Sequence, residues 1–156
     1  MFRILTAGVL LAASTAAFAA PATKFLNNAA RGDSGEVQMG QLLQQRSSNP
    51  AVRSYGRMLV ADHGAHRSQV DQLARRMGVR VSHSPKADAM AAMRHLRNLH
   101  GRAFDRYARS HAIEDHQKDI AEYQAQVRTG DRATARLASA TLPTLRKHLQ
   151  EARALR

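Results

Sequence analysis

Four long stretches of the chain carry apolar residues at alternating steps of three and four, and this repeat constrains the fold more than any other feature. Such spacing places apolar side chains along one face of an α-helix, whereas a half-buried strand would need strict alternation. No strand-like alternating run stands out, aromatic residues make up only 4% of the chain, and the helix-favouring residues Ala, Leu, Gln and Arg are abundant. The pattern therefore predicts an all-α protein.

Proline and glycine residues divide this pattern into separate helices. Pro21, Pro50 and Pro85 indicate boundaries, and Gly78 and Gly101 follow the last residues of helical segments. Two long hairpins, joined by a crossover that carries a short helix, predict a four-helix bundle with an accessory helix. The expected helices cover residues 23–45, 50–77, 86–100, 102–128 and 131–156.

The first twenty residues have the composition of a targeting segment. Arg3 is followed by an uncharged apolar run over residues 4–13, and residues 17–19 begin and end with alanine, as a signal peptidase requires. The apolar run is too short for a transmembrane anchor. We therefore expect a signal peptide at residues 1–19 and a single helical-bundle domain at residues 20–156.

The chain contains no cysteine, which excludes disulfides, lipoprotein attachment and thiolate metal sites. Together with the predicted signal peptide, this composition indicates a bacterial protein that is periplasmic or secreted. Association with the outer membrane is part of the same expectation.

One ionisable side chain interrupts the apolar face of each long helix. These residues are Glu36, His63, His116 and His148. Counting residues from the two hairpin turns places Glu36 level with His63, and places His116 about one turn from the level of His148. We expect the four side chains to form one layer that faces the interior of the bundle.

The two central histidines belong to a repeated motif, because "MLVADH" and "HAIEDH" align without a gap. Asp62 and Asp115 precede these histidines and are candidates for supporting the layer from outside. His66, one turn after the first motif, is an alternative member of the layer.

Two interpretations of this layer remain open. The histidines and Glu36 could form a buried network of hydrogen bonds that fixes the register of the helices, which is the simpler interpretation because motif spacing alone produces many false positives. Alternatively, three imidazoles and a carboxylate are ligands suited to one Zn, Fe, Cu or Ni ion.

Several stretches together resemble the bacterial family called domain of unknown function 4142, over about residues 24–153. This resemblance implies a ferritin-like helical bundle in an exported protein, in many members one described as an outer-membrane protein, and it implies no established activity. The di-iron ferritins carry a Glu-x-x-His motif that this chain lacks, so we expect at most one ion and no ferroxidase chemistry. The stretches are "FLNNAARGDSGEVQMGQL", "NPAVRSYGRMLVADHGAH", "GRAFDRYARSHAIEDHQKDI" and "LPTLRKHLQEA".

The formal net charge of +12 indicates anionic partners. An alternative function is therefore a basic envelope module that binds lipopolysaccharide or other anionic polymers. The arginines are scattered, no nucleic-acid motif is present and aromatic residues are few, so we do not expect nucleic-acid binding. Because no phosphate-binding loop or nucleophile–base arrangement stands out, the sequence favours a non-enzymatic role.

Overall fold

The computed structural model describes the backbone of residues 13–156 and the side chains from Pro21 onward. This part of the chain contains five α-helices and no strand, which confirms the predicted all-α class. Residues 1–12, and with them most of the predicted signal peptide, lie outside the described residues. The helices are α1 (Ala13–Arg46), α2 (Pro50–Arg76), α3 (Ala87–Arg97), α4 (Gly101–Thr129) and α5 (Arg132–Ala154).

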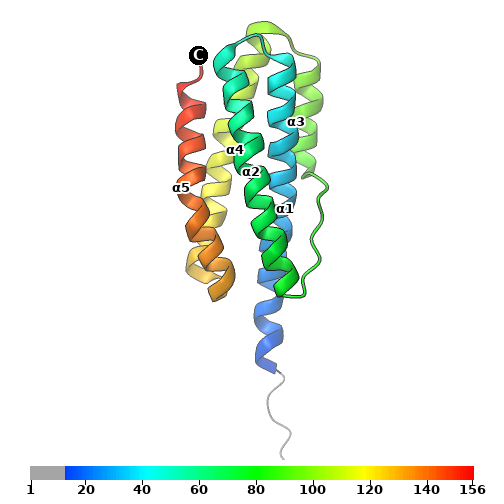
Figure 1. Cartoon of the computed structure of the whole chain (residues 1–156), viewed down its shortest axis with the longest axis vertical. Coiled ribbons are helices and arrows are strands. Elements are labelled where there is room, and N and C mark those ends of the chain that lie inside the picture. Colours follow the sequence, from blue (N-terminus) through cyan, green and yellow to red (C-terminus); the bar gives the residue numbers. More distant parts are fainter. Residues whose placement is uncertain (1–12) are drawn as a thin grey trace, which may run out of the picture.

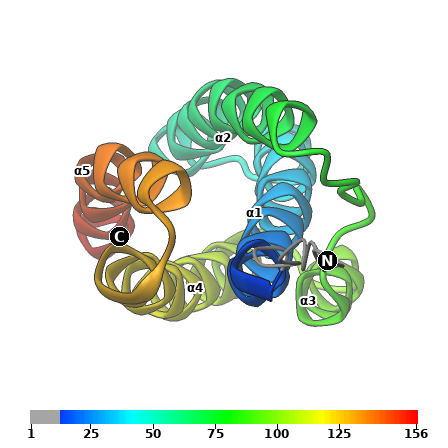
Figure 2. The ribbon, with the colours of Figure 1, turned by 90° about the horizontal axis from the view of Figure 1, so that it is seen from below.

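The helices form an elongated bundle (Figure 1). The most extensive contacts join α1 to α2 and α4 to α5, so each of these pairs is a helical hairpin. Seen from below, α1, α2, α5 and α4 surround a common centre, and α3 lies outside them next to α1 (Figure 2). The crossover from α2 to α4 therefore runs along the outside of the bundle and carries α3 with it.

Local capping explains where the second and last helices begin. The Asn49 side chain accepts a hydrogen bond of 2.9 Å from the Ala51 amide, and proline occupies the first position of α2. At α5, the Asp131 carboxylate accepts hydrogen bonds from the amides of Ala133 and Thr134. These caps satisfy amides that have no partner within their own helix.

Two helix boundaries differ from those expected by three residues or more. α1 begins at Ala13, so Pro21 lies inside a helix and is not a boundary. The residues before it are mostly alanine, the strongest helix former, and this preference outweighs the loss of one amide hydrogen bond at the proline. α3 ends at Arg97, three residues earlier than expected, because Asn98 forms its C-cap.

Two apolar cores fill the bundle, one above the other in the orientation of Figure 1. The stretch between them on every long helix holds ionisable residues, so a polar layer separates the two cores. The upper core includes Leu43, Val52, Leu59, Phe104, Ala108 and Ala152. The lower core includes Leu26, Val70, Leu73, Tyr123, Leu142 and Leu145.

Two glycines allow α1 and α2 to approach closely within the upper part of the bundle. A β-carbon on Gly40 would lie 2.5 Å from the Gly56 carbonyl oxygen, and a β-carbon on Gly56 would lie 2.6 Å from the Gly40 carbonyl oxygen. Both distances are shorter than van der Waals contact, so the two backbones would have to separate. This crossing fixes the spacing of the α1–α2 hairpin.

Replacing Gly56 with alanine should therefore destabilise the protein, although alanine favours helices more than glycine does. We expect the free energy of unfolding to fall by roughly 1–3 kcal/mol, the usual cost of overpacking. Gly64→Ala on the same helix is the matched control, because a β-carbon there meets no atom within 4 Å. Gly64→Ala should gain up to about 1 kcal/mol in urea denaturation, and equal effects at the two positions would contradict the close crossing.

Candidate metal centre

Three buried histidines from three different helices meet in the polar layer. His63 on α2 is 4% exposed, and His116 on α4 and His148 on α5 are both 0% exposed. One ring nitrogen of each histidine lies within 4.8 Å of one ring nitrogen of each of the other two. Three of the four residues that interrupt the predicted apolar faces thus come together at one point.

Each of the three imidazoles is held from outside by a hydrogen-bond acceptor. The acceptors are two carboxylates and one backbone carbonyl, so the ring nitrogen that faces each of them carries the proton. The nitrogen–oxygen distance is 2.9 Å in each of the pairs His63 Nδ1–Asp33 Oδ1, His116 Nδ1–Ala112 O and His148 Nε2–Asp62 Oδ2.

In the neutral form of each imidazole, the remaining ring nitrogen carries a lone pair. His116 Nε2 and His148 Nδ1 lie 3.2 Å apart, so two acceptors face each other at hydrogen-bond distance. His63 Nε2 is buried and has no hydrogen-bond partner. The centre therefore lacks a donor for three converging lone pairs.

Burial keeps the imidazoles of His116 and His148 neutral. The pKa of His116 is lowered to about 3 by burial and by the neighbouring His63 and His148. Burial also lowers the pKa of His148 to about 4, although the hydrogen bond to Asp62 acts in the opposite direction. At neutral pH the lone pairs of both residues are consequently unprotonated and available to a ligand.

Asp33 is a member of the site that sequence reasoning missed. Its Oδ1 atom accepts hydrogen bonds from His63 and His66, and its Oδ2 atom accepts one of 2.9 Å from His66. Burial would raise the pKa of Asp33, but the hydrogen bonds from the two histidines lower it overall, so the carboxylate is ionised. The available signal was its position one helical turn before Glu36, on nearly the same face of α1.

Of the other predicted residues, Asp62 contacts the site directly through His148, and His66 contacts it through Asp33. Glu36 is buried but lies outside the group of three converging histidines. The pKa of Glu36 is raised well above its ordinary value by burial and by the adjacent Asp115 carboxyl group. Glu36 and Asp115 thus form a separate carboxylate pair between α1 and α4.

Comparison with family models identifies the chain. The model of the family described as Domain of unknown function (DUF4142) matches residues 7–155. The chain belongs to the DUF4142 family. Neither the comparison with curated proteins nor the comparison with solved structures gave a match.

Within residues 13–156, no helix combines the length and the apolar character needed to cross a bilayer.

Acidification should reveal the neutral state of the buried imidazoles in the metal-free protein. Because the folded pKa of His116 is about 3 and the ordinary value is 6.5, the unfolded chain takes up a proton between these pH values that the folded chain does not. The parent should therefore lose stability relative to His116→Leu as the pH falls from 6.5 to 4, by up to about 1.4 kcal/mol for each pH unit.

Asp119 supplies the control of opposite sign. Burial and Asp115 raise its pKa to about 7, so the folded protein gains a proton before the unfolded chain does. Relative to Asp119→Asn, the parent should gain stability as the pH falls from 8 to 5. Urea denaturation of chelator-treated proteins measures both differences, and parallel pH profiles for parent and variants would contradict the assignment.

Proposed function

We propose that this DUF4142 protein binds one transition-metal ion between α2, α4 and α5. The ligands are His63 Nε2, His116 Nε2 and His148 Nδ1. The observation that carries this proposal is the set of three lone pairs that converge in a buried layer without any donor between them. A cation placed among them is a partner that all three can share.

The alternative interpretation, a layer of hydrogen bonds only, leaves polar atoms unsatisfied. A buried acceptor without a partner costs roughly 1–3 kcal/mol. His63 Nε2 is such an acceptor, and the contact between His116 Nε2 and His148 Nδ1 sets two further acceptors against each other. A hydrogen-bonded layer would instead be expected to pair each acceptor with a donor.

The groups around the three histidines are of the kind that supports metal ligands in proteins. Metal-binding histidines usually donate their second ring proton to a carboxylate or a backbone carbonyl, which fixes the tautomer and the orientation of the ring. Asp33, Ala112 and Asp62 provide these acceptors here. The ionised Asp33 carboxylate would also offset part of the charge of a divalent cation.

Three imidazole ligands suit Zn, Cu, Ni or Fe, and the usual order of affinities for a nitrogen site places Cu²⁺ above Ni²⁺ and Zn²⁺. Three protein ligands leave a fourth coordination position for water or another small ligand. We propose that the bundle is ferritin-like, with four long helices in two hairpins. We also propose that it is exported by the signal peptide and holds its ion in the bacterial periplasm.

Metal titration of the mature chain, produced without a histidine tag, tests the proposal. We expect one ion per chain by native mass spectrometry and a higher melting temperature with Zn²⁺ or Cu²⁺. A hundredfold excess of free ion over Kd stabilises the folded state by about 2.7 kcal/mol. His116→Ala should abolish both effects, whereas His83→Ala should retain them, because His83 is exposed and is not one of the three converging histidines.

The result that would overturn metal binding is equally specific. If no metal raises the melting temperature of the parent while His63→Leu stabilises the protein, the layer is a network of hydrogen bonds and nothing more.

Replacing the carboxylates that support the histidines should weaken binding without abolishing it. We expect Asp33→Asn and Asp62→Asn each to raise the Kd by about 10- to 100-fold, the usual effect of removing a hydrogen-bond partner of a ligand. Asp71→Asn on α2 is the control, because Asp71 pairs with the exposed His83 and not with one of the three converging histidines. Isothermal titration calorimetry measures the Kd of each of the three variants. An unchanged Kd in Asp33→Asn would show that Asp33 does not support the bound ion.

A further inference from the structure

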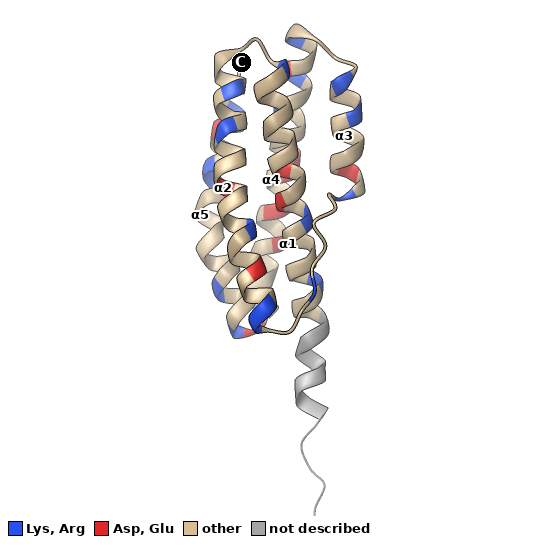
Figure 3. Ribbon diagram, turned by 45° about the vertical axis from the view of Figure 1, so that its right-hand side comes forward, with Lys and Arg blue, Asp and Glu red and all other residues tan. Residues whose placement is uncertain are grey.

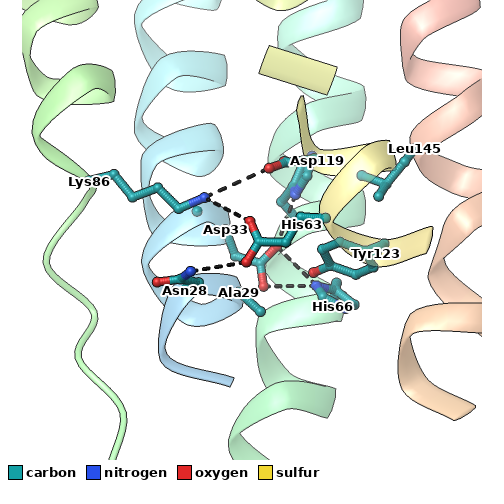
Figure 4. A pocket seen from close by; sticks show the side chains of 11 residues that line it. Asn28, Ala29, Asp33, His63, His66, Lys86, Asp119, Tyr123 and Leu145 are labelled. Carbon is teal, nitrogen blue, oxygen red and sulfur yellow. Dashed lines mark hydrogen bonds and ion pairs between the residues drawn. The ribbon is translucent and has the colours of Figure 1, made fainter. Parts of the chain in front are cut away.

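A small cavity reaches the polar layer from the side of α1 and α4. It offers about 10 Å³ to the centre of a water-sized sphere, which is the scale of a single water molecule. Asp33, His63 and His66 line its inner part, as Figure 4 shows. His63 belongs both to this cavity and to the three converging histidines, so its ring is the wall that the cavity shares with the candidate metal centre.

The outer part of the cavity is acidic. Asp119 and Glu122, one turn apart on α4, line it together with Lys86, the residue just before α3. Figure 3 shows acidic positions of α4 gathered beside α1. The chain has a net charge of +12 and only 12 acidic residues. Their grouping makes the electrostatic potential at this cavity more negative than the overall charge would suggest. The acidic residues between α1 and α4 are Asp33, Glu36, Asp115, Asp119 and Glu122.

A second observation indicates that this cavity receives a ligand. His66 lines the cavity, is only 8% exposed, and has no hydrogen-bond partner at Nε2. A buried nitrogen without a partner beside the ionised Asp33 carboxylate is a group that a cation or its bound water can satisfy.

Lys86 occupies the mouth of the cavity. Its Nζ atom lies 3.8 Å from Asp119 Oδ1 and 3.9 Å from Glu122 Oε2. Burial lowers the pKa of Lys86, but Asp119 and Glu122 raise it overall, so the ammonium group is charged. Figure 4 shows the side chain reaching from the loop before α3 towards Asp119.

The loop that carries Lys86 is attached to α1. Arg31 Nε donates a hydrogen bond of 3.0 Å to the Ser84 carbonyl, and Arg31 Nη2 donates one of 3.3 Å to the Pro85 carbonyl. Glu122 is held in turn by Asn28, whose amide donates to Glu122 Oε1 at 3.0 Å. Residues of α1 therefore hold both the loop that carries Lys86 and the Glu122 carboxylate.

We propose that this cavity is the route by which the metal cation reaches the three histidines, and that the Lys86 ammonium closes its mouth. The inference rests on the proposed metal binding. A divalent cation first displaces the ammonium from Asp119 and Glu122, then passes Asp33 and His66 to the His63 ring. Lys86 thus acts on the rate of exchange, because it occupies the entrance and is not a ligand of the bound ion.

The rates of metal binding and release test this route. Association is followed by mixing the mature chain with Zn²⁺ and a chromophoric competitor, and dissociation by adding excess chelator to the loaded protein. We expect Lys86→Gln to raise both rates by about tenfold, within the range of electrostatic effects on association, while Kd changes less than either rate. Glu122→Gln should slow association by a similar factor.

An exposed ion pair on α4, the helix that carries Glu122, provides matched controls. Lys118 Nζ lies 2.6 Å from Glu114 Oε1, and neither residue lines the cavity. Lys118→Gln and Glu114→Gln change the net charge by the same amounts as the test variants and should leave both rates at the parent values. Lys86→Arg keeps the charge and should retain slow exchange.

Metal binding and the entry route are contradicted by different results. If the parent does not bind Zn²⁺ at one ion per chain, both the proposed function and the entry route are wrong. If the parent binds Zn²⁺ but Lys86→Gln and Glu122→Gln exchange it at the rates of their controls, the site stands and the route is overturned. Helical circular dichroism of each metal-free variant establishes that the comparison is made between folded proteins.

Discussion

A buried layer of ionisable groups lies across the bundle and divides its apolar interior in two. Every long helix contributes to this layer, and the apolar cores above and below it hold the helices together. The cost of burying charged and polar groups is limited by pairing: Asp33 joins two histidines of α2, and Asp62 joins α2 to α5 through His148. The same pairings leave three nitrogens facing inward. The outer hydrogen bonds of the three histidines thus leave one nitrogen of each ring for the cation that we propose at the centre.

Much of the fold could be predicted from the sequence because helix periodicity is a local property. The spacing of Val52, Leu59 and Val70 indicates a helix with one buried face, and all three are buried in α2. The start of α1 could not be predicted, because Pro21 alone indicates a boundary while the alanines around it favour a helix. The end of α3 depended on which of several residues forms the cap, a choice made by tertiary contacts.

The candidate site was partly predictable for a related reason. Helical rise is constant, so counting from the turns places His63 near the level of Glu36, and His116 near that of His148. The rotation of each helix about its own axis is set by packing. Sequence periodicity identifies only a broad buried face, so it does not show which residue of that face points towards a given neighbour. On α1 this rotation directs Asp33 towards the histidines of α2, while Glu36 lies beside Asp115 of α4. Lys86 comes from a loop whose path depends on Arg31, a contact between residues more than fifty positions apart.

The net positive charge of the chain is compatible with the cation site proposed for its interior, because the two act over different distances. At physiological ionic strength, charges in water are screened over about 8 Å, so arginines on the far surface contribute little at the entrance of the cavity. Asp119 and Glu122 lie at that entrance, and Asp33 lies at its inner end, where burial weakens screening. Lys86 lies beside Asp119 and Glu122 and offsets part of the negative charge at the entrance. A divalent ion carries twice the charge of the ammonium and can coordinate directly to imidazole. It can therefore displace a lysine that monovalent ions would leave in place.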